Sequence, residues 1–384
     1  MNHQTIQNIA DAEGFSLMGI APAISPTGYP QLLQWIEDGF AAEMNYFAER
    51  KEAYRHPNAV LNGVRSIVAL AFPYPAFANR EASAPMTGKV ARYATIGSDY
   101  HDILHPKLKR ICRAITELAP ESKNRGVVDT APLMEREFAQ LAGLGWIGKN
   151  TLLINKSQGS YFFLASVLTS LELEPTTPHH TAHCGTCTAC ITACPTDAFP
   201  EPGRLDARKC ISYLTIEHRD SIPLSLREKI GDWVFGCDIC QEVCPWNRKP
   251  ARSEANSRSD ATSHLEETLD LPTLFLMDDE RFREVFRKTP MWRPRRRGML
   301  RNAAIVMGNQ NDPAALPSLK IGLHDSDPVV RGSCAWAIGN LRFPAGRLFL
   351  LERQLIEQDP SVIEEIEGAL KHLPPNSPPS PQQA

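Results

Sequence analysis

The sequence predicts an α/β domain, then a small cysteine-rich domain, then an all-α domain of paired helical repeats. Helical and strand patterns alternate through residues 1–172. Eight of the ten cysteines lie between Cys184 and Cys244. Beyond residue 255 the patterns are helical and repetitive. The predicted domains are therefore 1–172, 173–255 and 256–373, followed by a disordered tail over 374–384.

Length and composition are those of an ordinary globular protein. The 384 residues suffice for two or three domains, and the net charge of −3 means that a nucleic-acid partner would need a local basic patch. With no secretory signal and no apolar stretch of about 18 residues, we expect a cytoplasmic protein without membrane contact. Ten cysteines in that compartment indicate metal or redox chemistry, with Cys112 and Cys334 expected in the core.

Ten segments make up the predicted α/β domain, whose sheet we expect to be mixed. Helices are predicted where apolar residues recur at helical spacing, and strands where short apolar runs occur. The predicted helices cover residues 5–14, 30–40, 42–50, 101–119 and 132–145, the last with Pro132 in its first turn. The predicted strands cover 15–22, 65–75, 125–129, 151–155 and 161–171. Polar linkers over 172–183 and 248–264 border the cysteine-rich domain.

The C-terminal patterns repeat with a period near 30 residues. Gly308-Asn309 recurs as Gly339-Asn340, and Asp327-Pro328 recurs 32 residues later as Asp359-Pro360, each Asp-Pro opening an apolar helix. This is typical of HEAT-like solenoids, in which each helix pair buries its apolar face against the next.

The cysteines form two ferredoxin-like runs. "CGTCTACITACP" (184–195) has the spacing C-x2-C-x2-C-x3-C-P, in which three cysteines ligate one 4Fe-4S cluster and the fourth ligates another. "CDICQEVCP" (237–245) lacks only the first cysteine of such a run, which Cys210 can supply. One predicted ligand set is Cys184, Cys187, Cys190 and Cys244, and the other is Cys194, Cys210, Cys237 and Cys240.

Structural zinc is the alternative for these cysteines. It is disfavoured because zinc sites prefer two C-x2-C pairs for each tetrahedral ion, and the paired Cys-Pro endings have no role there. Two 4Fe-4S clusters would pass single electrons to an acceptor elsewhere in the chain.

Asp129 is the candidate for chemistry in the α/β domain. It ends a predicted strand just before a helix, where α/β proteins place their active sites. On pattern alone it could equally cap that helix. No G-x-G-x-x-G follows a predicted strand, so a dinucleotide-binding site is not supported, and no P-loop is present.

Taken together, these motifs resemble the epoxyqueuosine reductase family. The resemblance rests on the two cysteine runs, "VVDTAPLMEREFAQLAGLGWIGKNTLLI" (127–154), "RYATIGSDYH" (92–101) and "CDICQEVCPWN" (237–247). It spans nearly the whole chain. It implies that the α/β domain binds cobalamin and that the enzyme reduces the epoxide of epoxyqueuosine in the tRNA wobble position to the alkene of queuosine, the last step of queuosine biosynthesis.

The resemblance also implies roles for individual residues. Cob(I)alamin, supplied with electrons by the two 4Fe-4S clusters, would reduce the substrate, and Asp129 would be the proton donor. We expect burial against the corrin to raise the pKa of Asp129. The implied cobalamin contacts are Arg55, Asp129, Lys149, Asn150, Ser212, Tyr213, Cys237 and Asp238.

A basic segment is the candidate tRNA-binding surface. "RFREVFRKTPMWRPRRRGMLR" (281–301) contains nine basic residues and one acidic residue, with aromatic side chains interleaved. The alternative is a solvated helix face whose charge is compensated by the acidic residues just upstream. The candidate contacts are Arg293, Arg295, Arg296 and Arg297, with His218 and Arg219 as weaker candidates.

Two other functions fit parts of the sequence. A reductive dehalogenase shares a corrinoid and two clusters, but such enzymes typically carry an export signal and use tyrosine as the acid. An electron-transfer ferredoxin module on a repeat scaffold would need neither cobalamin nor an acid at Asp129. For the reductase we expect a monomer that receives electrons from an unidentified low-potential donor.

Overall fold

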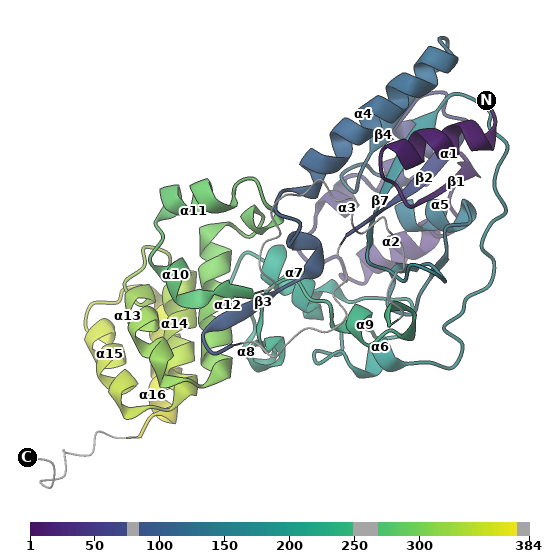
Figure 1. Cartoon of the computed structure of the whole chain (residues 1–384). Helices are drawn as coiled ribbons and strands as arrows, with labels where there is room; N and C mark the ends of the chain where they lie inside the picture. The colour runs from purple at the N-terminus through teal and green to yellow at the C-terminus, as the bar shows by residue number, and fades with distance from the viewer. Residues whose placement is uncertain (75–83, 249–267, 375–384) are drawn as a thin grey trace, which may run out of the picture. The chain divides into compact units, whose positions relative to one another are not determined.

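Figure 1 shows the computed structural model, which describes residues 1–74, 84–248 and 268–374. The predicted linker over 248–264 and tail over 374–384 lie outside these residues, apart from the first residue of each. The chain divides into two compact units. The first comprises Met1–Arg80, Arg92–Arg208 and Asp238–Leu265, and the second comprises Glu81–Ala91, Lys209–Cys237 and Glu266–Ala384.

A four-stranded sheet forms the centre of the first unit. Its order is β1 (Leu17–Pro22), β2 (Ser66–Pro73), β7 (Phe162–Thr169) and β4 (Asn124–Val127), and every neighbouring pair is antiparallel. The expectation of a mixed sheet is therefore wrong for these strands. The chain leaves β1 at Pro22 and enters β2 at Ser66 directly opposite, so the helices between them form an excursion and not a parallel crossover.

Successive side chains of β2 point to opposite faces of this sheet, and they are buried on both faces. Val68 and Leu70 pack under α1 (His3–Ala12) and α4 (Tyr100–Leu118), whereas Ile67 and Ala69 pack under α5 (Glu135–Leu141) (Figure 1). This period of two is expected of a strand covered on both sides. The sheet lies between two helical layers, with α2 (Tyr29–Glu37) and α3 (Tyr46–Glu49) in the β1–β2 excursion.

Local signals predicted these elements well, with two exceptions. Helix α5 begins at Glu135, so Pro132 lies before the helix instead of in its first turn. The hairpin of β5 (Trp146–Ile147) and β6 (Leu153–Ile154) was predicted only in its second strand. Each strand of this hairpin is two residues long, too short to give a periodic signal.

The second unit contains a small sheet built from distant segments. Its order is β8 (Trp233–Phe235), β3 (Thr87–Val90) and β9 (Thr268–Asp270), with β3 parallel to β8 and antiparallel to β9. The insertion between Cys210 and Cys237 belongs to this unit and also forms α7 (Ile211–Ile216) and α8 (Leu224–Arg227).

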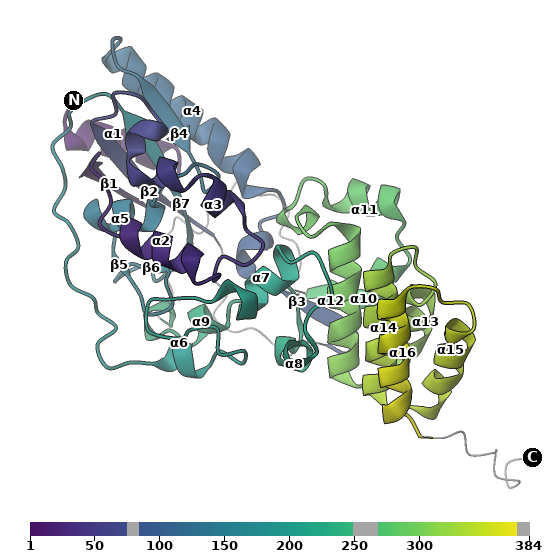
Figure 2. The ribbon, with the colours of Figure 1, turned by 180° about the vertical axis from the view of Figure 1, so that it is seen from behind.

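Paired helices complete the second unit, and α12, α14 and α16 lie side by side (Figure 2). Asp327 and Asp359 cap α14 and α16 through their side chains, so the two Asp-Pro signals do open helices. A Cβ on Gly339 would lie 2.6 Å from Cα of Ala369, so this glycine permits the close approach of α14 and α16. The seven helices are α10 (Leu271–Phe275), α11 (Asp279–Phe286), α12 (Arg295–Gln310), α13 (Leu316–Gly322), α14 (Pro328–Leu341), α15 (Pro344–Gln354) and α16 (Pro360–His372).

Both cysteines outside the two predicted ligand sets contribute to the core. Cys334 is fully buried in α14, and Cys112 is partly buried in α4 against the sheet. Among the described residues, no helix is both long and apolar enough to cross a bilayer.

A largely buried ion pair joins the insertion between Cys210 and Cys237 to α16. The side chain of Arg227 is 2% exposed, and its guanidinium donates to both carboxylate oxygens of Glu365 on α16 and to the carbonyl of Ile222. We expect Arg227→Met to lower the free energy of unfolding by about 3 kcal/mol, because Glu365, whose side chain is only 18% exposed, loses its partner. Urea unfolding monitored by circular dichroism would measure this change.

Arg281→Met is the matched control for this prediction. Arg281 pairs with Glu284 on the surface of α11, where the two side chains are 63% and 59% exposed. We expect its loss to cost less than about 1 kcal/mol. Equal effects of the two substitutions would contradict the proposed importance of the buried pair.

Candidate functional site

Asp129 lies just beyond the end of β4, with its side chain 48% exposed. It does not cap the following helix, because α5 begins six residues later with Met134 at its N-cap position. The helix-cap interpretation is therefore wrong, and the carboxylate is used for other contacts.

The start of α4 holds this carboxylate. The Tyr100 hydroxyl donates to Oδ2 of Asp129, and Nε2 of His101 lies 2.8 Å from Oδ1. On the other side of the imidazole, Nδ1 lies 2.8 Å from Oδ1 of Asp99. Asp99 also caps α4 by accepting from the backbone N–H of His101. Because each ring nitrogen faces a carboxylate oxygen, this geometry favours the doubly protonated imidazolium.

These contacts set the protonation of the site. Hydrogen bonds to Asp129 and then to Asp99 raise the pKa of His101 to about 10. Desolvation would raise the pKa of Asp129, but the hydrogen bonds from His101 and Tyr100 outweigh it and hold that pKa below its ordinary value. The expected rise in the pKa of Asp129 refers to burial against a bound corrin and stays a prediction. At neutral pH Asp129 is a carboxylate, and the proton is held on His101.

A second carboxyl group lies in the field of the first. Glu135, the first residue of α5, has a pKa raised to about 8 by desolvation and then by the negative charge of Asp129. Its Oε1 atom has no hydrogen-bond partner among the described residues. Close to neutral pH this group is largely protonated.

The sequence analysis missed Asp99, Tyr100 and His101 as site residues. All three lie in the stretch "RYATIGSDYH". No characteristic sequence spacing links this stretch to Asp129. Tyr100 is fixed by stacking on Phe163 of β7, with ring centroids 4.6 Å apart and an interplanar angle of 14°. The only local signal was an aspartate followed by a tyrosine and a histidine at a helix start.

The first predicted ligand set surrounds one cavity. Cys184, Cys187, Cys190 and Cys244 all line a space of about 260 Å³. Desolvation and then the charges of neighbouring thiols, Cys184 first among them, raise the pKa of Cys244, which means that free thiolates here would repel one another. Among the described residues, no three His, Cys, Asp or Glu side chains converge closely enough to hold a single metal ion. Four cysteines around one cavity are a donor set that fits a 4Fe-4S cluster.

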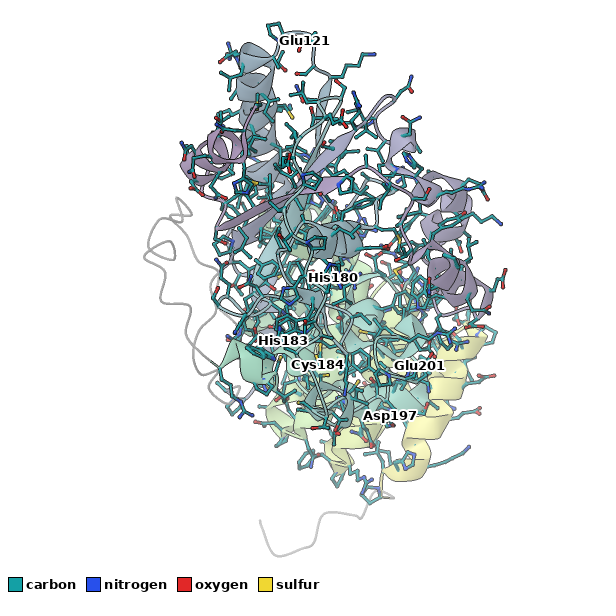
Figure 3. The ribbon with its side chains drawn as sticks, turned by 90° about the vertical axis from the view of Figure 1, so that its right-hand side faces the viewer. Glu121, His180, His183, Cys184, Asp197 and Glu201 are labelled. Atoms are coloured by element: carbon teal, nitrogen blue, oxygen red, sulfur yellow. The ribbon has the colours of Figure 1, made fainter. Side chains whose placement is uncertain are left out.

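Aromatic side chains pack behind this cavity. Trp146 is fully buried, with its ring centroid 5.1 Å from that of Trp246 and 4.9 Å from that of His183. His183 and Cys184 lie together at the start of the cysteine segment (Figure 3). The indole N–H of Trp146, packed against Cys184 and Cys244, has no acceptor among the described residues. This orphaned donor fits a sulfur-rich group bound nearby.

The second predicted ligand set draws on both units. Cys194 and Cys240 belong to the first unit, and Cys210 and Cys237 belong to the second. Within the first unit, Sγ of Cys194 accepts from the backbone N–H of Ala198 at 3.4 Å. Such N–H donors to sulfur are common around iron–sulfur clusters.

The predicted cobalamin contacts have different surroundings. Arg55 is exposed at the end of η1 (Lys51–Arg55). Asn150 is 3% exposed and donates to the carbonyl of Cys240 at 3.3 Å. Asp238 is 2% exposed and accepts from the backbone N–H of Arg92 at 2.8 Å.

The remaining predicted contacts are divided between the units. Lys149 of the first unit donates to the carbonyls of Gly185 and Cys187. Ser212, Tyr213 and Cys237 belong to the second unit. Of the predicted contacts in the first unit, Arg55 and Asp129 are exposed, Lys149 is half-buried, and Asn150 and Asp238 are buried.

The predicted tRNA-binding residues all lie in the second unit, where the structure brings its two basic stretches together. Arg219 donates to the carbonyl of Arg293 at 2.8 Å, and the Arg293 guanidinium pairs with Glu217 at 3.0 Å. Arg297 pairs with Asp220 at 3.1 Å. The segment around His218 is thereby tied to the start of α12.

Other arginines of this region have mainly structural contacts. Arg301, at the end of the basic segment, is fully buried and donates to the carbonyls of Leu214, His218 and Asp220. Arg296 is 15% exposed and pairs with Asp325 at 2.6 Å. The exposed Arg295 instead lies over the ring of Trp292, 4.1 Å from its centroid.

A broad cavity of about 800 Å³ lies beside Arg295. Five of its lining residues are basic and three are acidic, and the floor includes Phe282 and Trp292. The lining residues are Asp279, Glu280, Phe282, Arg283, Glu284, Arg287, Lys288, Trp292, Arg295 and Arg296.

Known proteins match both the cysteine region and the segment that contains Asp129. A family model described as a 4Fe-4S double cluster binding domain matches residues 183–247, and one described as epoxyqueuosine reductase QueG matches residues 55–130. An epoxyqueuosine reductase from Cyclobacterium marinum is 40% identical over 306 residues, covering 79% of this chain and 96% of the relative. The chain belongs to the epoxyqueuosine reductase family. It is accordingly an oxidoreductase, and it contains a 4Fe-4S double-cluster domain.

Other relatives and solved structures agree with this assignment. The epoxyqueuosine reductase of Pseudomonas aeruginosa is 37% identical, covering 87% of this chain and 93% of that protein. A Bacillus subtilis epoxyqueuosine reductase, solved with its catalytic aspartate loop swung out of the active site, superposes with a TM-score of 0.86 at 28% identity over 97% of this chain and 98% of that one. An epoxyqueuosine reductase solved with an epoxyqueuosine-modified tRNA stem loop has a TM-score of 0.85 at 30% identity, covering 96% of this chain and 98% of that one.

The bridge between Asp99 and Asp129 predicts an unusual titration of His101. The pKa of His101 in the folded protein is about 10, above the ordinary value of 6.5. The charged imidazole therefore stabilises the fold fully below pH 6.5. This stabilisation is lost as the pH rises through about 10. In Asp129→Asn we expect the pKa of His101 to fall, because one of its two carboxylate partners is neutralised. Histidine NMR titration would measure the pKa, with His105→Gln identifying the signal of the neighbouring ring. An unchanged pKa in Asp129→Asn would contradict the bridge.

Proposed function

We propose that this chain reduces the epoxide of epoxyqueuosine at the tRNA wobble position to the alkene of queuosine, the last step of queuosine biosynthesis. The observation that supports this most directly is the bridge of Asp129, His101 and Asp99 within the segment matched by the epoxyqueuosine reductase model. Conversion of an epoxide into an alkene consumes two electrons and two protons and releases water. It therefore needs a positioned acid beside a source of electrons.

Proton delivery is the part that the described side chains would perform. Asp129 is half-exposed and deprotonated, and the imidazolium of His101 touches it. The proton held on His101 would move to Asp129 and from Asp129 to the epoxide oxygen as its C–O bond breaks, and solvent would then reprotonate His101. Asp99 holds the imidazole in place, and Tyr100 fixes the second oxygen of the acid.

Cobalamin and two 4Fe-4S clusters are the proposed cofactors. When bound, a reduced corrinoid supplies electrons to the substrate. Both nitrogens of His101 face carboxylates, so this ring would serve proton transfer at Asp129. Arg55 and Asp129 would face the cofactor from the first unit. The clusters would be held by the two cysteine sets and charged by a low-potential electron donor.

We also propose that tRNA carrying epoxyqueuosine is bound by the second unit. The cavity beside Arg295 combines cations with an aromatic floor, as phosphates and unstacked bases require. Arg295 is the best placed of the six candidates, since it is exposed and stacks on Trp292, whereas Arg293, Arg296 and Arg297 pair with carboxylates.

Asp129→Asn tests the acid. We expect turnover of epoxyqueuosine-containing tRNA under anaerobic, chemically reducing conditions to fall by about 10²–10⁴, because a positioned acid contributes about that factor. Iron, sulfide and cobalt contents should not change. Asp102→Asn, at an exposed position of the same helix start, is the matched control and should keep full activity. Full activity of Asp129→Asn would remove the assignment of the acid.

Arg295→Gln tests the nucleic-acid surface. Loss of one phosphate contact should weaken tRNA binding at low salt and reduce the slope of log affinity against log salt concentration by about one. Fluorescence anisotropy over a salt series would measure both. Arg113→Gln removes an equal charge from an exposed site on α4 and should leave binding unchanged. An unaltered salt slope for Arg295→Gln would place the tRNA elsewhere.

A further inference from the structure

The ammonium group of Lys149 holds the turn that contains the first two cysteines. Its Nζ donates to the carbonyl of Gly185 at 2.7 Å and to that of Cys187 at 3.0 Å. These carbonyls belong to the turn from Cys184 to Cys187, which is itself closed by a backbone hydrogen bond of 2.9 Å. A lysine from the β5–β6 hairpin thus fixes a loop of the cysteine-rich segment.

The backbone around Lys149 is rigidly held. Gly148 donates to the carbonyl of Leu152 at 2.8 Å, and Thr151 donates to Gly148 at 2.9 Å, which closes the hairpin turn. The carbonyl of Lys149 accepts from Gly203 at 2.8 Å. A Cβ at position 148 would lie 2.5 Å from Cδ1 of Ile154, so the turn is also tightly packed. Lys149 is therefore placed precisely, unlike a freely moving surface lysine.

Lys149 also lines the cavity bounded by Cys184, Cys187, Cys190 and Cys244. None of the described residues that line this cavity is acidic. The charge of the ammonium group is consequently not neutralised at the cavity wall. Its two acceptors are carbonyl dipoles, which orient the group without cancelling its charge.

A cation at this position has a defined effect on a cluster. Four thiolates outweigh the positive charge of an iron–sulfur core, so the bound cluster is an anion and its reduction adds a further negative charge. A fixed cation stabilises the reduced form more than the oxidised form, and nearby charge is one of the factors that set cluster potentials. Loss of that cation would make the cluster harder to reduce.

We propose that Lys149 sets the reduction potential of the cluster held by Cys184, Cys187, Cys190 and Cys244, and that it does so while orienting the Cys184–Cys187 turn. This inference rests on the proposed iron–sulfur cofactors but not on the identity of the substrate. Lys149 is a positioning residue that acts on the cluster through charge. It makes the first cluster a better electron acceptor than its thiolate ligands alone would allow.

The test is an EPR-monitored redox titration of the cluster-loaded full-length protein. In Lys149→Gln we expect the ratio of reduced to oxidised first cluster at a fixed potential to fall about tenfold, equivalent to a shift of about −59 mV for a one-electron couple. The other cluster should keep its potential. Lys149→Arg, which keeps the charge, should retain the wild-type value.

Lys156→Met is the matched control, because Lys156 is an exposed lysine of the same hairpin region that does not line the cavity. It should leave both potentials unchanged. Equal shifts of both clusters, an equal shift in Lys156→Met, or no shift in Lys149→Gln would each overturn the inference.

Three further outcomes separate this inference from related failures. If Lys149→Gln loses the first cluster, the Lys149→Arg variant tests the role of charge instead. A Lys149→Arg protein that keeps the cluster at a lowered potential would overturn that role. A Lys149→Arg protein that keeps the cluster at the wild-type potential would support it. If the wild-type protein itself shows no 4Fe-4S signals, the proposed cofactors fail. If it shows both signals and Lys149→Gln titrates identically, only this inference fails.

Discussion

The contact between His101 and Asp129 is the interaction on which the candidate site depends. Alone, Asp129 would be an ordinary surface carboxylate at the end of an edge strand. It becomes a defined group because the N-terminus of α4 supplies two donors to it, and that N-terminus is fixed by the Asp99 cap and by Leu104 and Leu108 under the helix. The order of strands and the packing of α4 on the sheet are thus requirements of the chemistry as well as of stability.

Spacing in the sequence predicted the features that are local. The cysteines that line one cavity are those that the ferredoxin crossover assigns to one cluster, and the Asp-Pro pairs open α14 and α16. Asp129 was singled out because strand ends are where α/β proteins place reactive groups. Each of these inferences needed only the residues of one motif, or the known rule by which two ferredoxin cysteine runs share their ligands between two clusters.

Features that depend on distant segments could not be predicted in this way. His101 lies 28 residues before Asp129, and no periodicity joins them. The basic segment 281–301 looked uniformly available to tRNA because its counter-charges, Glu217, Asp220 and Asp325, come from other parts of the chain. Likewise, β3 pairs with strands about 140 and 180 residues away, so composition alone did not reveal it.

The close approach of α14 and α16 limits which residue position 339 can accept. At Gly339 the nearest atoms to any added side chain are backbone and Cβ atoms of Ala369. A larger residue there could not be accommodated by trimming its neighbour, because the neighbour's main chain is what it would meet. The spacing between these two helices therefore depends on glycine at position 339, and any side chain introduced there would force α14 and α16 apart.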